Sequence, residues 1–440
     1  MTPSRIPRLR PGLLVNAFSL MATTILTAVL GLAFWALAAR VYPVTTIGES
    51  SVEISTATLL ATLTQLNLTR IFARFVPVAG PRTKALIIGG YGVTAAFGTI
   101  VGTVFVVVGL GDEFLPSTFN RVIFVIGVPM MTLFALQAAA LIGLRASVWV
   151  MVENTVFSVA KLLLLPVLAL LATDSGIFLS WMIPLVVAFV VVHVLMSSRL
   201  IPAHEARSEG KHELPDRRGM ASFVTAEYAS SIVESLGTLL LPLIVLTVLG
   251  SEASAYFYMP WLIGSTLNLL LVNIAMSFGV EAVSHPEQTG TLARRTMRLI
   301  IGATVPATVI GIIGAPFFLS ILGPQYAENG TTLFRLILAA LPFIGIYSFY
   351  VTFAWIERRV WWLLGLQTVA SGATLAISGL LMGSQGINAV GIALFVTWTF
   401  LGLASIYPVS KRLRQLWRRP PADVVSAEPD TDRATVVEPS

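Results

Sequence analysis

The sequence predicts an all-α polytopic membrane protein, with about twelve transmembrane helices arranged as two six-helix lobes around a central cavity. Of the 440 residues, 56% are hydrophobic and only 11% are charged, whereas a soluble domain usually carries about 25% charged residues. Apolar runs of about 20 residues, the length that crosses a bilayer, recur along the whole chain. Basic residues gather in alternate connections between these runs, as they do in multi-span membrane proteins.

Short polar breaks separate the apolar runs from one another. The second run is the least apolar, because Glu49, Glu53 and several threonines interrupt it, and a hydropathy window could miss it. We expect twelve membrane-spanning helices, over residues 14–39, 47–69, 86–110, 122–144, 148–172, 177–197, 221–249, 255–280, 299–322, 332–356, 360–383 and 387–409.

The distribution of Lys and Arg tests this number of spans. If the N-terminus is cytoplasmic, 24 of the 28 basic residues fall in cytoplasmic segments. Outside connections hold only Arg40 and Arg121, and Lys161 and Arg335 fall within spans. Positively charged connections stay on the cytoplasmic side. We therefore expect both termini in the cytoplasm and an even number of spans.

The longest interior polar stretch, residues 198–220, divides the chain into two halves of six spans. RASVW begins the fifth span at Arg145, and RRVWW begins the eleventh at Arg358. Either this is a parallel internal repeat, or both are ordinary helix entrances with interfacial Arg and Trp. The expected organisation is a cytoplasmic N-terminus (1–13), an N-lobe (14–197), a cytoplasmic linker (198–220), a C-lobe (221–410) and a basic, then disordered, cytoplasmic tail (411–440).

The composition excludes several classes of chemistry. There is no Cys and there are only four His, so disulfides, thiolate metal sites and imidazole metal clusters are not expected. The sequence has no Walker or Gly-rich phosphate motif, so we expect no ATP hydrolysis. The loops are short and lack acidic or histidine clusters. We therefore expect a transporter rather than an enzyme, without a cofactor, and with proton or sodium coupling left open.

Charged groups within the spans are few. An ionisable group near the bilayer centre costs at least about 2.5–3.5 kcal/mol, so such groups usually pair, face a cavity or carry function. We expect a water-filled cavity lined by the second, fifth, seventh and tenth spans. The charged groups in the spans are Glu49 and Glu53 in the second, Glu153 and Lys161 in the fifth, His193 in the sixth, Glu227 and Glu234 in the seventh, and Arg335 in the tenth.

The basic groups could form a clamp for phosphate through charge-assisted hydrogen bonds. The acids could couple transport to an ion, but they could equally be static partners of other helices. Glu49 and Glu53 could be a solvated helix start, and helix-end arginines could be topology signals only. The clamp candidates are Arg335, Lys161, Arg40, Arg70, Arg74 and Arg145, and the ion-coupling candidates are Glu234, Glu153 and Glu227.

Several motifs resemble one family of bacterial exporters. The segment ILGPQYAENG at 321–330, the following Leu333, Arg335 and Leu336, and AALP at 339–342 are similar to its signature. So are FWALAARVY at 34–42 and LIGLR at 141–145. Over residues 14–410 the chain resembles the polysaccharide biosynthesis (O-antigen) flippase family of the multidrug/oligosaccharidyl-lipid/polysaccharide (MOP) exporter superfamily.

This resemblance implies a MATE-like bundle that moves polyprenyl-diphosphate-linked oligosaccharide across the bacterial cytoplasmic membrane by alternating access. It implies a cationic cavity in which Arg335 occupies a motif position, and partners such as the glycosyltransferases or polymerase of the same pathway. Lipid II flippases of the superfamily carry two further helices, for which this chain has no room. A multidrug or cation antiporter of the same superfamily is the alternative, and no nucleic-acid partner is expected.

Overall fold

The computed structural model describes residues 11–171, 175–207, 217–284, 289–357 and 359–418. Over these residues it is all-helical, as predicted. The helices of the N-terminal half are α1 (Pro11–Val41), α2 (Val44–Thr64), α3 (Leu68–Phe75), α4 (Thr83–Val107), α5 (Thr118–Gly143), α6 (Ser147–Leu170), α7 (Gly176–Leu195) and α8 (Ile201–Arg207). Two short 3₁₀ turns precede α4, and the π-helical turn Met196–Leu200 joins α7 to α8.

The C-terminal half contains α9 (Arg217–Ser284), α10 (Thr289–Ser320), α11 (Pro324–Ile356), α12 (Val360–Gln385) and α13 (Asn388–Arg418). Within α9, Gly250 has φ 86°, which breaks the helix into two parts. A positive φ is accessible to glycine at little cost because it lacks a β-carbon. The two parts of α9 correspond to the seventh and eighth expected spans.

Nine helices of the described residues are long and apolar enough to cross a membrane. Both parts of α9 are counted there as one span, and α1 appears only as a shorter apolar helix over Leu26–Val41. The remaining predicted span, α2, falls short of that criterion, as its interrupting acids and threonines led us to expect. Its polar side faces protein, because Ser50, Ser51 and Glu53 are all buried.

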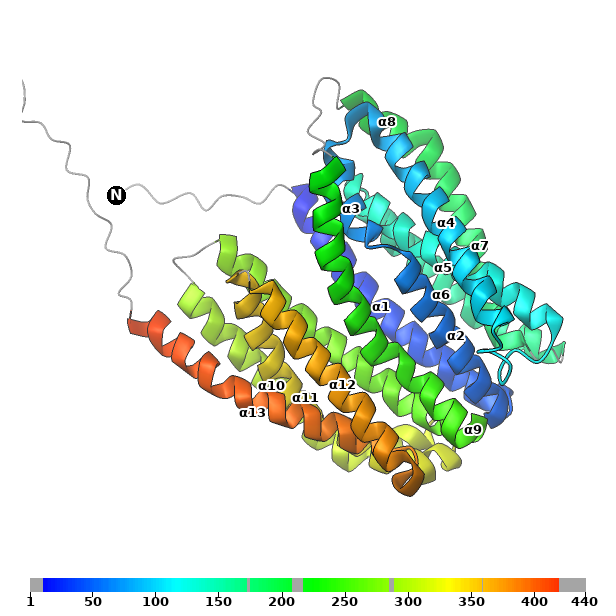
Figure 1. The fold of residues 1–440 in the computed structure, drawn as a ribbon, viewed down its shortest axis with the longest axis vertical. Helices are drawn as coiled ribbons and strands as arrows, with labels where there is room; N and C mark the ends of the chain where they lie inside the picture. Colours follow the sequence, from blue (N-terminus) through cyan, green and yellow to red (C-terminus); the bar gives the residue numbers. More distant parts are fainter. Residues whose placement is uncertain (1–10, 172–174, 208–216, 285–288, 358, 419–440) are drawn as a thin grey trace, which may run out of the picture.

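The helices form two bundles. Figure 1 shows α1 to α8 on one side and α10 to α13 on the other, with the first part of α9 between them. Within the bundles α1 packs on α6, and α11 packs on α10 and α13, while α2 and α9 pack along each other. The α2–α9 contact therefore joins the N-terminal and C-terminal lobes.

The lobes touch closely near the turn between α1 and α2. Gly48 of α2 lies against Ser251, directly after the break in α9, so that a β-carbon at Gly48 would overlap the Ser251 carbonyl oxygen. Nearby, the Arg40 guanidinium donates a hydrogen bond to the carbonyl oxygen of Ile321 at 3.2 Å. A close approach of two backbones and one side chain-to-backbone hydrogen bond thus join the two lobes at this end of the molecule.

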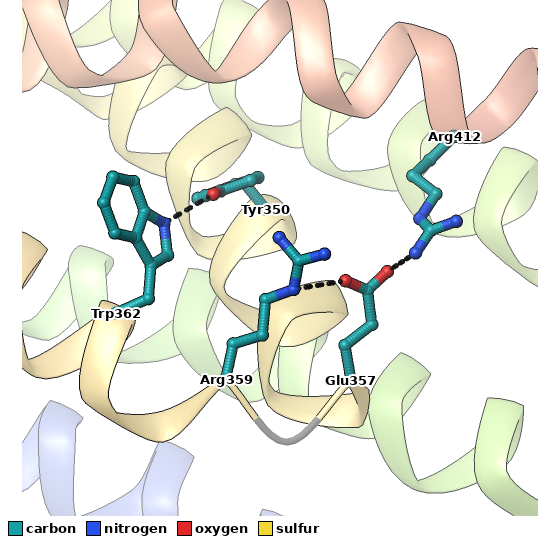
Figure 2. A network of polar contacts seen from close by, with 5 residues as sticks. All are labelled: Tyr350, Glu357, Arg359, Trp362 and Arg412. Carbon is teal, nitrogen blue, oxygen red and sulfur yellow. Dashed lines mark hydrogen bonds and ion pairs between the residues drawn. The ribbon is translucent and has the colours of Figure 1, made fainter.

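A polar network joins two helix ends of the C-lobe (Figure 2). Glu357, which follows α11, pairs with Arg359 at 3.0 Å and with Arg412 of α13. Beside it, the Trp362 indole N–H donates to the Tyr350 hydroxyl at 2.8 Å. These contacts tie the turn between α11 and α12 to the last helix.

Candidate functional site

Lys161, in the middle of α6, is a buried cation surrounded by aromatic rings. Only 4% of the residue is exposed. Its ammonium nitrogen lies 3.5 Å from the ring centroid of Trp181, 4.9 Å from that of Phe157 and 5.1 Å from that of Phe34. The negative faces of aromatic rings attract a cation, most strongly where water is excluded. We call Lys161 with these three rings the lysine box.

Three helices position the lysine box. Phe157 precedes Lys161 by four residues and therefore lies on the same face of α6. Phe34 comes from α1 and Trp181 from α7, and their rings meet edge to face with centroids 5.6 Å apart. Trp181 also contacts Phe157 at 5.8 Å. These contacts between rings fix the walls of the box before any ligand arrives.

A cavity of about 370 Å³ lies beside the lysine box, between the lobes. It is lined by α1, α6 and α7 of the N-lobe and by the second part of α9, whose Tyr258 contacts Trp35 across the boundary at 4.8 Å. Lys161 is the only charged residue among the described residues that line it. We call this space the central cavity, and its electrostatic character is cationic.

An apolar groove of about 550 Å³ adjoins the central cavity. Leu32, Trp35 and Leu262 line both spaces, so the two are adjacent. Every described residue of the groove is apolar, and the walls come from α1, α9, α10 and α11 together with the turn after α10. The combination offers a positive charge at one end and a hydrocarbon-like surface at the other.

The helices around the central cavity differ from those expected. Of the second, fifth, seventh and tenth spans, only the fifth, α6, lines it in the described structure; the first, sixth and eighth complete the wall. The expectation followed the positions of charged residues. The walls consist instead of aromatic, small and aliphatic side chains, while the polar side of α2 is buried by packing along α9.

The structure does not bring the other clamp candidates to Lys161. Arg335 is exposed, and its Nε donates to the Ile312 carbonyl oxygen on α10 at 3.0 Å. Arg40 is exposed and bonds to Ile321 as described above. The remaining three are exposed around α3 and in the turn between α5 and α6, where Arg145 has φ 59°. These three are Arg70, Arg74 and Arg145.

Glu153 lies two turns before Lys161 on α6 but does not pair with it. It is 1% exposed, and neither carboxylate oxygen has a hydrogen-bond partner within the described part of the chain. Tyr91 of α4 is close enough for electrostatic interaction with Glu153, and its ring lies 5.8 Å from that of His193. The imidazole of His193 stacks on Phe189, and its Nδ1 is buried without a partner among the described residues.

We call Glu153, Tyr91 and His193 the N-lobe polar cluster. It groups a carboxyl, a phenol and an imidazole within the membrane-spanning part of one lobe. The sequence selected Glu153 as an ion-coupling candidate and gave His193 no role beyond its place in the sixth span. Ionisable side chains are rare in the three spans that contain these residues. That rarity is the feature of the sequence from which the cluster could have been predicted.

Glu53, Glu227 and Glu234 are further acidic residues that we singled out in the spans. Glu53 is 3% exposed, and its Oε1 has no hydrogen-bond partner among described residues. The interpretation of Glu53 as part of a solvated helix start is therefore wrong, because α2 is covered by α9 there. The helix α9 contains Glu227 and Glu234, but their side chains lie outside the described part of the structure.

Comparison with known proteins identifies the fold. No protein-family model and no curated protein sequence matches the chain. Among solved structures, the MATE multidrug transporter DinF-BH aligns with TM-score 0.67 and 10% identity, covering 94% of this chain and 98% of that one. The lipid II flippase MurJ, in an inward closed conformation, aligns with TM-score 0.64 and 12% identity, covering 92% and 90%.

A third similar structure is a MOP superfamily transporter from Pyrococcus furiosus, described as having a binding pocket of reverse polarity. It aligns with TM-score 0.60 and 12% identity, covering 93% of this chain and 96% of that one. Because all these identities are low, the similarity establishes the shared two-lobed fold. The three structures that share this fold are a multidrug transporter, a lipid II flippase and a MOP superfamily transporter.

Proposed function

We propose that this protein is a flippase that moves a polyprenyl-diphosphate-linked oligosaccharide across the bacterial cytoplasmic membrane by alternating access, for synthesis of cell-surface polysaccharide. One observation carries the proposal. The only charged residue among the described lining of the central cavity is the buried Lys161, and this cavity is adjacent to a groove whose described lining is apolar. An anionic head group attached to a long hydrocarbon chain matches both surfaces at once.

The lysine box supplies the recognition of phosphate. A charge-assisted hydrogen bond from an ammonium group to a phosphate oxygen is stronger than one between neutral groups. The rings of Phe34, Phe157 and Trp181 stabilise the ammonium group. A diphosphate would replace part of this stabilisation with a direct ion pair, in a site that is largely shielded from water.

The groove accounts for the lipid part of the substrate. A prenyl chain would lose little by leaving the bilayer for a surface made of Leu, Ile, Phe and Ala side chains, because both surroundings are apolar. The shared residues Leu32, Trp35 and Leu262 would lie at the junction of the diphosphate and the chain. The polar head group can then cross inside the protein while the chain remains in an apolar environment.

Alternating access requires two arrangements of the lobes. The contacts Gly48–Ser251 and Arg40–Ile321 hold together the end that the distribution of basic residues places outside. A substrate shifts such an equilibrium only if its free energy of binding differs between the two arrangements. We propose that diphosphate binding at Lys161 provides this difference, since the cavity wall includes residues of both lobes.

A MATE-like cation antiporter is the second candidate. The buried carboxyl groups of Glu53 and Glu153 favour it, because such a transporter needs acidic groups in the membrane. Neither acid lines the central cavity among the described residues, whereas Lys161 does. A cationic drug in that cavity would face an unfavourable like charge, so the flippase is the better supported function.

Reconstituted vesicles can distinguish these functions. Purified protein in liposomes would be given fluorescent undecaprenyl-diphosphate-linked sugar, and its transfer between leaflets followed by chemical quenching from outside. We expect transfer above that of empty liposomes and no uptake of the cationic dye rhodamine. Uptake of the dye without movement of the lipid-linked sugar would replace the flippase by the antiporter.

A further inference from the structure

The C-lobe contains a second cavity, of about 360 Å³, that the charge analysis did not reveal. Both parts of α9, together with α11, α12 and α13, form its walls. At Gly237 the first part of α9 approaches α12 so closely that a β-carbon would overlap the Ser371 side chain. Pockets that bind small molecules usually have volumes of about 300–1,000 Å³, so this space is large enough for a ligand.

The described wall of this C-lobe cavity is partly polar and carries no charged side chain. The polar side chains come from two helix faces: Ser265 and Asn268 on α9, and Gln367, Ser371 and Thr374 on α12. Their spacings of three or four residues place each set on one side of its helix. None of the described lining residues is acidic or basic. The described part of the wall therefore offers hydrogen bonds from neutral side chains.

Two amide side chains of the wall make no hydrogen bond among the described residues. Among the described residues, neither Asn268 nor Gln367 makes a hydrogen bond, although Thr374 bonds to the carbonyl oxygen of Ala370. An amide supplies two donor hydrogens and an acceptor oxygen. Both side chains are half-buried and line the cavity. Their donors and acceptors are therefore accessible to a ligand with several hydroxyl or amide groups.

Two indole rings complete the wall. Trp261 stacks on Phe257 with centroids 5.7 Å apart, and Trp398 contacts Tyr347 at 5.3 Å, so both rings are held in place by neighbours. A flat apolar ring covers the C–H face of a sugar, while amides and hydroxyls bind its rim. Trp, amide and hydroxyl side chains without charges are together the chemistry that recognises a neutral sugar.

The two cavities lie on either side of the second part of α9, and Leu269 lines both. We infer that the C-lobe cavity is a subsite for a neutral sugar of the transported substrate, held while Lys161 binds its diphosphate. This inference rests on the proposed function. It assigns the diphosphate of the head group to the central cavity and the neutral sugar to the C-lobe cavity. Asn268 and Gln367 are then residues that determine sugar specificity.

Binding to the full-length protein in nanodiscs tests the inference with three probes: undecaprenyl diphosphate, and the same lipid carrying either N-acetylglucosamine or galactose. For the wild type, we expect at least one sugar-bearing probe to bind about tenfold more tightly than the bare diphosphate, equivalent to one or two net hydrogen bonds. Asn268→Leu and Gln367→Leu should abolish this ratio and leave binding of the bare diphosphate unchanged. Gln385→Leu, at an exposed position of the same helix α12, is the matched control.

The outcomes separate the two claims. The sugar subsite would be overturned if the wild type bound the sugar-bearing lipids and the bare diphosphate with equal affinity, or if both leucine variants kept the wild-type ratio of affinities. Either result would leave the proposed flippase function unaffected. Failure of all three lipids to bind the wild type would overturn the flippase and the subsite with it. Binding of a rhodamine dye that is lost in Gln367→Leu would assign the cavity to a cationic drug instead.

Discussion

Gly48 on α2 and Ser251 on α9 meet so closely that the contact leaves no room for a β-carbon at Gly48. The atom in the way is a backbone carbonyl oxygen, which cannot rotate aside as a side chain would. The two residues belong to different lobes, and they lie at the end where Arg40 also bonds to Ile321. This contact is therefore a natural place to change the equilibrium between the two arrangements of the lobes.

We expect Gly48→Ala to open this end of the molecule. The added methyl group costs about 1–3 kcal/mol in the closed arrangement, as overpacking does elsewhere, and little once the lobes separate. Because the chain has no Cys, spin labels on Thr45→Cys and Val248→Cys would report the distance across the contact. A longer distance population should grow in Gly48→Ala but not in Gly89→Ala, whose site on α4 has space for a methyl group.

Replacing Lys161 by Met separates its role in binding from any role in stability. Met fills an aromatic pocket without a charge, so thermal stability should be equal or higher. Affinity for undecaprenyl diphosphate should fall by about 10- to 100-fold, the value of a charged hydrogen bond. Binding and thermal unfolding of the same preparation check both parts, with the exposed Lys84→Met as control. Unchanged affinity would remove Lys161 from the substrate site.

The fold was largely predictable from residue patterns, and the reasons are local. The dipeptide Leu249-Gly250 ends an apolar run, and the structure breaks α9 at Gly250. Even the weak second span is a helix, α2, because polar residues are acceptable where a neighbouring helix covers them. Twenty-residue apolar runs leave the backbone few alternatives to a helix, since every peptide group in the bilayer must be hydrogen-bonded.

The site was predictable only in part. Lys161 was selected because it falls within a span, where a charge has to be sheltered, and the structure buries it. Arg335 lies in a segment that resembles a family motif, but its side chain is exposed and bonds to α10. The spacing of residues along a helix shows which side chains share one face. It does not show which other helix packs against that face. For the same reason Trp181 and the amides of the C-lobe cavity could not be selected before the helices were assembled.

Trp181 and Lys161 should be coupled in stability. Cation–π contacts contribute about 0.5–2 kcal/mol, depending on how far water is excluded. In a double-mutant cycle of Trp181→Leu with Lys161→Met, the coupling energy measured from unfolding should fall in that range. Trp398→Leu with Lys161→Met is the control, because Trp398 lies in the C-lobe cavity. Additive effects in both pairs would show that the rings pack around Lys161 without stabilising its charge.

The ion pairs around Glu357 should contribute little to the stability of the protein. The side chains of Glu357 and Arg412 are 24% and 46% exposed, and ion pairs near the surface typically contribute about 0–1 kcal/mol. Glu357→Gln should therefore lower the free energy of unfolding by no more than about 1 kcal/mol at low salt, and by less in high salt, which screens the pair. Chemical unfolding at two salt concentrations checks this, with the exposed Glu328→Gln as control. A larger, salt-independent loss would give the network a structural role.

Glu153 should confer dependence on a proton gradient. Its two carboxylate oxygens are buried and have no hydrogen-bond partner among the described residues. A single carboxyl group can take up and release a proton. Glu153→Gln keeps the shape of the protonated acid and removes the exchange. Movement of the lipid-linked sugar in vesicles should persist in this variant but should no longer respond to a pH difference across the membrane.

The exposed Glu281→Gln on α9 should keep the wild-type response. A response to pH that survives in Glu153→Gln would assign coupling to another carboxyl group, and a response to sodium alone would exclude proton coupling.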